Sequence, residues 1–156
     1  MAEPISAIWV DADSCPRRVR EIIARAAERR RISTYYLANR EIPIPKSAYV
    51  SMIVVSGAPE AVDARILAQA PSTALVVTRD IPLAAQLVER GLLVLNDRGE
   101  VFSVENVRER LSLRNFSKEL RDAGLYRSDG DTHDHRAVQA FANALDRELQ
   151  RRGVDG

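Results

Sequence analysis

The sequence predicts an α/β fold with a mostly parallel sheet of five strands. Short apolar runs bounded by turn residues recur between residues 8 and 95, and such runs are typical of strands buried on both faces of a sheet. Helical patterns separate these runs, which indicates repeated βαβ units. The expected strands are residues 8–11, 33–37, 50–55, 74–78 and 92–95.

Proline, glycine and arginine mark the ends of the helices between these strands. Pro16 begins the first helix, because the first helical turn tolerates proline, and residues 29–31, all arginine, close it at the negative end of the helix dipole. Pro59 begins the second helix. The third extends over residues 80–90 and ends before Gly91.

The last third of the chain is predicted to be helical. Ser103 can cap a helix that residues 115–117 can interrupt and that ends at Gly124. Residues 125–133 are rich in Asp, Gly and Ser and are expected to form a loop. One face of the final helix is apolar: Val138, Phe141, Ala142, Leu145 and Leu149. Because no repeat or linker is evident, residues 1–156 are interpreted as one domain.

Composition is that of an ordinary globular protein. Hydrophobic residues make up 46% and charged residues 29% of the chain. The net charge of +1 gives no general attraction to nucleic acid or to anionic membranes. The single cysteine, Cys15, excludes an internal disulfide and fits a reducing compartment. With no leader pattern or membrane-length apolar run, the expected location is the cytoplasm.

Two aspartates follow the first and fourth apolar runs. Asp11 ends the first run, and Asp80 lies two residues beyond Thr78. If the strand order is 3-2-1-4-5, which right-handed crossovers permit, both side chains face one crevice at the carboxyl edge of the sheet. Clustered carboxylates repel one another, and hard cations such as Mg²⁺ prefer carboxylate oxygen. The sequence therefore predicts an acidic metal site there.

Each acidic residue also has a structural explanation. Asp11 or Asp13 could cap the first helix, and Asp80 could cap the third. Asp63, in the first turns of the second helix, could interact only with the helix dipole. These alternatives stay open at the level of sequence.

Other reactive side chains are given structural roles. Cys15 is expected to be a packing residue, because the two histidines that could activate it, His133 and His135, lie far along the chain. These histidines are expected to be solvated. Arg18 and Arg20, like Arg17, fit a solvent-facing helix surface, although each could also contact phosphate.

Several motifs resemble the YaiI/YqxD family of uncharacterised bacterial proteins. They are Val-Asp-Ala-Asp-Ser-Cys-Pro (10–16), Leu-Ala-Asn (37–39), Val-Thr-Arg-Asp-Ile-Pro-Leu-Ala (77–84), Leu-Asn-Asp-Arg-Gly-Glu (95–100) and Ala-Leu-Asp-Arg (144–147). The family is grouped with PIN-like domains, so the resemblance implies a Rossmann-like three-layer α/β/α sandwich. It also implies an acidic cluster that holds Mg²⁺ or Mn²⁺ for RNA hydrolysis.

The resemblance assigns site residues position by position. The motif acids are Asp11, Asp63 and Asp80, with Asp13 adjacent. Ala64 departs from the family pattern, in which a second acid commonly follows the first, and this puts a second metal ion in question.

The leading hypothesis is a metal-dependent nuclease that acts on RNA in preference to DNA. Asp11 and Asp80 would hold the ion, with Asp63 and Asp13 in support. Thr78 and Asn39 could orient water or substrate. The predicted basic rim consists of Arg17, Arg18 and Arg79.

Two alternative hypotheses assign the chain to other functional classes. A haloacid-dehalogenase-like phosphatase would use Asp11 as nucleophile, Asp13 as general acid and Ser56 in its second motif. It also needs a lysine between Ser56 and Asp80, where none occurs. A catalytically degenerate PIN-like module would bind nucleic acid or protein; Ala64 and the aromatic content of 5% favour it.

Overall fold

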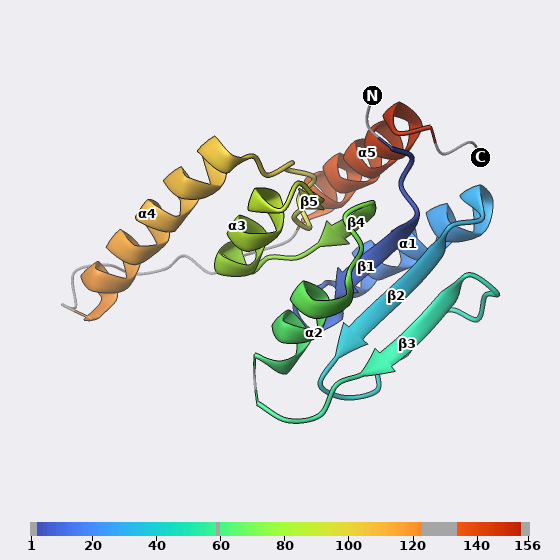
Figure 1. Ribbon diagram of the computed structural model, residues 1–156, viewed down its shortest axis with the longest axis horizontal. Helices are drawn as coiled ribbons and strands as arrows, with labels where there is room; N and C mark the ends of the chain where they lie inside the picture. Colours follow the sequence, from blue (N-terminus) through green and yellow to red (C-terminus); the bar gives the residue numbers. More distant parts are fainter. Residues whose placement is uncertain (1–2, 59, 123–133, 154–156) are drawn as a thin grey trace.

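The structure, a computed structural model, describes residues 3–58, 60–122 and 134–153. Its centre is a five-stranded parallel sheet with the order β3-β2-β1-β4-β5 (Figure 1). The strands are β1 (Ala7–Asp11), β2 (Ser33–Ala38), β3 (Val50–Val54), β4 (Ala74–Val77) and β5 (Leu93–Leu95). The predicted fold class, strand order and neighbouring positions of the first and fourth strands are confirmed.

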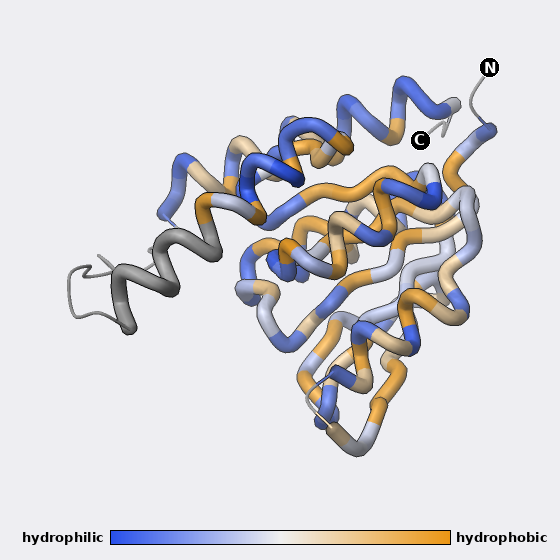
Figure 2. The backbone as a smooth tube through the Cα atoms, turned by 60° about the vertical axis from the view of Figure 1, so that its left-hand side comes forward, coloured by the Kyte–Doolittle hydropathy of each residue, from blue (hydrophilic) through white to orange (hydrophobic). Residues whose placement is uncertain are grey.

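Helices cover both faces of the sheet and complete the α/β/α sandwich (Figure 1). Side chains of α1 (Arg17–Arg30) and α5 (His135–Arg151) belong to one apolar cluster. Side chains of α2 (Ala61–Gln69), α3 (Ile81–Glu89) and the start of α4 (Val104–Asp122) belong to the other. Figure 2 shows hydrophobic segments through the middle of the molecule and hydrophilic stretches on the outer helices.

Strand β1 divides its side chains between the two clusters, because successive residues of a strand point to opposite faces. Ile8 and Val10 belong to the cluster with α1, and Ala7 and Trp9 to the cluster with α2. All five residues of β1 are buried. This explains why the strand reads as a continuous apolar run, and it leaves Asp11 as the polar residue at the end of a buried strand.

The C-terminal region differs in part from the prediction. The interruption expected at residues 115–117 is wrong, because α4 continues from Val104 to Asp122. Ser103 does cap this helix: its Oγ accepts a hydrogen bond from the Asn106 backbone N–H at 3.1 Å. The expectations for Pro59, Gly124 and the loop at 125–133 lie outside the described residues.

Strand register places the candidate site. Val10 is paired with Val77, so the residue after β4, Thr78, stands level with Asp11. On the other side of β1, Asp11 is paired with Leu37 of β2. Among the described residues, no helix combines the length and apolarity that crossing a membrane requires.

Candidate acidic site at the carboxyl edge of the sheet

Asp11 is a buried carboxylate whose hydrogen-bond partners are the hydroxyl groups of Thr78 and Ser14. It is 8% exposed, and its Oδ2 accepts a hydrogen bond from Thr78 Oγ1 at 2.9 Å. Burial raises the pKa of Asp11, and the charges of Asp80 and Asp13 raise it further. The hydrogen bonds of Thr78 and Ser14 oppose these effects. The ionised form of Asp11 is therefore held at a cost in free energy.

Asp80 begins α3 directly beside Asp11. Its Oδ1 accepts a hydrogen bond from the Leu83 backbone N–H at 2.9 Å, so the helix-cap interpretation of Asp80 is confirmed. The Asp80 backbone N–H donates to Thr78 Oγ1 at 3.0 Å. Thr78 thus links Asp11 to the start of α3, and its predicted role in orienting water or substrate stays a prediction.

Asp63 reaches the same place from α2. It lies in the first turn of that helix and forms a side-chain hydrogen bond with Asp80. Burial raises its pKa to about 7, and the charges of Asp80 and Asp11 contribute to this rise. The fold therefore brings together three acids from separate segments, as the sequence predicted for Asp11 and Asp80.

Asp13 is exposed and has a different contact. Its Oδ2 accepts a hydrogen bond from the Asn39 backbone N–H at 2.9 Å, which ties the segment after β1 to the end of β2. The N-cap of α1 is Pro16, and no side chain caps that helix. The interpretation of Asp11 or Asp13 as the cap of the first helix is therefore wrong. The Asn39 side chain itself is exposed.

Of the predicted rim arginines, Arg79 lies at the acidic site. A pocket of about 290 Å³ is lined by Arg79 together with Asp11, Ser14 and Asp80. Arg17 pairs with Glu21 at 3.2 Å and lines a separate pocket beside α1, and Arg18 is exposed on the same helix.

Asp97 is a site residue that the sequence reasoning missed. It is 4% exposed, and its Oδ2 accepts hydrogen bonds from Arg79 Nε at 2.9 Å and Nη2 at 2.5 Å. Asp97 follows β5 as Asp11 ends β1, so its place after an apolar run was the available signal. The turn that carries it is closed by Asn96 Oδ1, which accepts from the Arg98 and Glu100 backbone N–H groups.

Cys15 and the described histidine, His135, are not members of the acidic cluster. Burial, followed by the charge of Asp97, raises the pKa of Cys15 to about 12, so the side chain is a neutral thiol at physiological pH. Asp134 Oδ1 caps α5 by accepting from the Ala137 backbone N–H at 2.9 Å, and His135, the first residue of that helix, is exposed. His133 lies outside the described residues.

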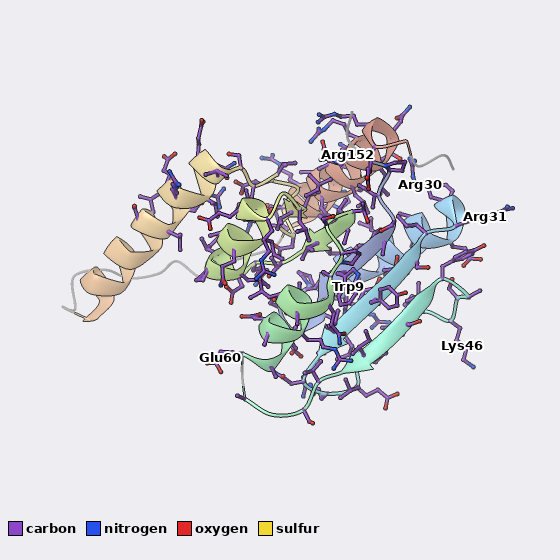
Figure 3. The ribbon with its side chains drawn as sticks, in the orientation of Figure 1. Trp9, Arg30, Arg31, Lys46, Glu60 and Arg152 are labelled. Carbon is purple, nitrogen blue, oxygen red and sulfur yellow. The ribbon has the colours of Figure 1, made fainter. Side chains whose placement is uncertain are left out.

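Labelled charges in Figure 3 are separated along the sheet. Glu60, beside the start of α2, lies towards the carboxyl ends of the strands, whereas Arg30 and Arg31 lie towards their amino ends. The charge of Glu60 also raises the pKa of Asp63. Glu60 therefore adds its negative charge to that of Asp11, Asp63 and Asp80 at this part of the edge.

The donor atoms fit a hard cation, although their present arrangement is not a coordination sphere. Carboxylate and hydroxyl oxygens are the ligands that Mg²⁺ and Mn²⁺ prefer. Within the described ranges, no three acidic, histidine or cysteine side chains are arranged to hold a metal ion. The hydrogen bond between Asp63 and Asp80 requires a proton on one carboxyl group, and a cation would have to displace that proton.

Two relatives with uncharacterised names and one family model match this chain. The uncharacterised YaiI/YqxD family matches residues 9–151. A UPF0178 protein of Myxococcus xanthus is 50% identical over 144 residues, 92% of this chain and 94% of the relative. A UPF0178 protein of Dechloromonas aromatica is 48% identical over 142 residues, 91% of this chain and 95% of the relative. No solved structure matches the chain. These matches establish that the chain belongs to the YaiI/YqxD family of uncharacterised bacterial proteins.

Proposed function

We propose that this protein is a metal-dependent nuclease that hydrolyses phosphodiester bonds, in RNA in preference to DNA. The observation that carries the proposal is the convergence of Asp11, Asp63 and Asp80 at one edge of a parallel sheet, from β1, α2 and the start of α3. Ligands of open α/β sheets bind at this edge. The acids there repel one another without a cation, and binding of Mg²⁺ or Mn²⁺ would relieve this repulsion.

Each residue has a defined task in this proposal. Asp11 and Asp80 would hold the cation, with Asp63 and Asp13 in support. When bound, the ion supplies Lewis-acid polarisation of a phosphoryl oxygen and increases the acidity of water. Thr78 fixes the Asp11 carboxylate through its hydrogen bond. Arg79, held by Asp97, lines the acidic pocket and would position a substrate phosphate.

A second candidate function is that of a degenerate PIN-like module that binds RNA or protein without turnover. It is favoured by Ala64 and by the absence, among the described residues, of a preformed three-ligand group. The phosphatase alternative is disfavoured by topology. Ser56 follows the edge strand β3, and β2 separates that strand from β1 and Asp11.

Cleavage of an end-labelled single-stranded RNA separates these functions. We expect products with Mn²⁺ or Mg²⁺, none with EDTA, and a strong loss with Asp11→Asn. Glu89→Gln, which removes an exposed acid at the end of α3, serves as a control and should cleave like the wild type. No cleavage with either ion, together with no thermal stabilisation by Mn²⁺, would contradict the nuclease proposal and favour the binding module.

A further inference from the structure

A second pocket adjoins the acidic one and is rich in arginine. Its volume is about 240 Å³, and Arg79 and Ile81 line both pockets. The charged side chains around this second pocket are Arg79, Arg98, Arg110, Asp97 and Glu100. We call it the arginine pocket. It lies between the turn after β5 and the first half of α4.

Neighbouring side chains hold Arg79 and Arg110 in position. Asp97 accepts two hydrogen bonds from Arg79. Arg110 pairs with Glu100, and its guanidinium carbon lies 5.9 Å from the centre of the Phe102 ring. Guanidinium groups fixed in this way lose less conformational entropy when they bind an anion than free side chains do.

The turn that carries Arg98 is equally constrained. Gly99 adopts a φ of +82°, and a Cβ atom there would lie 2.5 Å from the backbone oxygen of Ala140. Asn96 Oδ1 accepts from the Arg98 backbone N–H at 2.9 Å. The backbone position of Arg98 at the pocket is therefore set by the fold.

The arginine side chains of this pocket suit one phosphate diester. Three arginines line it together with two carboxylates, and the charge of Arg98 also interacts with that of Asp134 before α5. A guanidinium group donates two parallel hydrogen bonds to phosphate oxygens. The Asn96 side chain already closes the turn, so the described lining favours phosphate contacts over recognition of a base edge.

We propose that the arginine pocket binds the phosphate adjacent to the scissile phosphate of single-stranded RNA. The assignment rests on the proposed function, which places the scissile phosphate at the acidic pocket. Because Arg79 lines both pockets, a strand with one phosphate beside Asp11 extends directly towards Arg98 and Arg110. Asp11 is 8% exposed, so the substrate must bend into the hollow, which a single strand does more readily than a duplex.

The test is binding of a fluorescein-labelled oligouridine of about eight nucleotides to the full chain in EDTA, followed by fluorescence anisotropy. Arg98→Gln combined with Arg110→Gln should weaken binding roughly tenfold. The slope of log affinity against log salt should become shallower by about 0.7, the value for one phosphate contact on a single strand. Arg108→Gln, an exposed arginine on α4 outside the pocket, is the matched control and should leave both quantities unchanged.

Arg98→Lys combined with Arg110→Lys keeps both charges but not the paired guanidinium hydrogen bonds, so it should restore the salt slope and part of the affinity, which separates charge from damage to the fold. Unchanged affinity and salt slope in the glutamine variant would overturn the proposal that the arginine pocket binds a phosphate. Equal affinity for duplex RNA of the same length would overturn the single-strand assignment. Arginine-dependent binding without cleavage in Mn²⁺ would support the pocket and contradict the nuclease proposal, so the two failures are distinguishable.

Discussion

Asp11 and Asp97 are two buried aspartates at the carboxyl edge of one sheet, and they differ in their partners. They are 8% and 4% exposed, and both line a small space that also contains Cys15. Asp97 accepts two hydrogen bonds from the Arg79 guanidinium. Asp11 has neutral hydroxyl partners, Thr78 and Ser14, and the charges of Asp80 and Asp13 near it are acidic.

This difference separates a supporting carboxylate from a candidate ligand. A buried ion is stable when an opposite charge compensates the loss of hydration. Asp97 has that compensation within the chain, so its charge serves the structure by holding Arg79. The charge of Asp11 lies among other acids. A cation from solution would provide the compensating positive charge that the chain does not supply.

The largest effect on stability is expected from Asp97→Ala. The change removes the carboxylate from a pair in which Asp97 is 5% and Arg79 33% exposed at the side chain, so the guanidinium loses a buried partner. We expect a loss of about 2 kcal/mol in unfolding free energy, measured by urea denaturation. Glu21→Ala is the matched control. Glu21 pairs with Arg17 at 3.2 Å, and the two side chains are 41% and 85% exposed, so the loss of this pair should cost less than about 1 kcal/mol.

Equal losses in Asp97→Ala and Glu21→Ala would contradict a supporting role for the buried pair. The contrast with Asp11 would then have no energetic basis.

Asp11→Asn should have the opposite effect on the metal-free protein. Neutralising a carboxylate whose pKa is raised by burial and by neighbouring acids should leave the melting temperature unchanged or increase it. The increase in melting temperature produced by Mn²⁺ in the wild type should be lost. A marked decrease in metal-free stability would show that the fold requires the charge of Asp11, as it requires that of Asp97.

The sequence predicted the strand order and the convergence of acids because both depend on local patterns. Buried strands are continuous apolar runs, and their carboxyl ends meet at one edge when the sheet is parallel. Asp11 and Asp80 could therefore be placed together before any side-chain geometry was known. The same rule applied to residues 92–95 and would have identified Asp97.

Which groups these side chains contact could not be predicted in the same way. Whether Arg79 contacts Asp97 or the acidic cluster depends on the separation of β4 and β5 and on the rotamers at their ends. The role of Asp13 depends on a backbone N–H of a residue distant in sequence, Asn39. Nor could helical spacing exclude a break at residues 115–117, since α4 is continuous there.

Asp63 should make the stability of the metal-free protein dependent on pH. Its folded pKa is raised to about 7, above the ordinary value near 4 of an unfolded chain. The stabilisation from its protonated form is therefore complete below about pH 4 and is lost as the pH rises through about 7. Asp63→Asn keeps a donor for Asp80 and should not lose this contribution.

The measurement is the difference in unfolding free energy between wild type and Asp63→Asn across that pH range, in EDTA. The unfolding free energy of Asp63→Asn should increase relative to that of the wild type as the pH rises. A constant difference would contradict the close contact of Asp63 with Asp80 and Asp11, and with it the convergence at the site.

Asp80→Asn should have a smaller effect on the fold. Asn caps a helix about as well as Asp, and the Leu83 N–H keeps an oxygen acceptor, so stability should change by less than about 1 kcal/mol. Stabilisation by Mn²⁺ should decrease, because a neutral oxygen replaces a charged ligand. Identical Mn²⁺-induced shifts in melting temperature for variant and wild type would remove Asp80 from the metal site.

The smallest effect on activity is expected from Cys15→Ser. Cys15 lines the same small space as the two compared aspartates. Burial together with the charge of Asp97 raises its pKa to about 12, so almost no thiolate exists at neutral pH. Any nuclease activity should stay within a few fold of the wild type, and iodoacetamide should modify the folded wild-type thiol slowly. Complete loss of activity, combined with rapid alkylation of the wild type, would identify Cys15 as a reactive group and show that the space between Asp11 and Asp97 is accessible. Slow alkylation with retained activity would instead confirm a closed, neutral packing residue there, and only the partners of the two carboxylates would then distinguish the two strand ends.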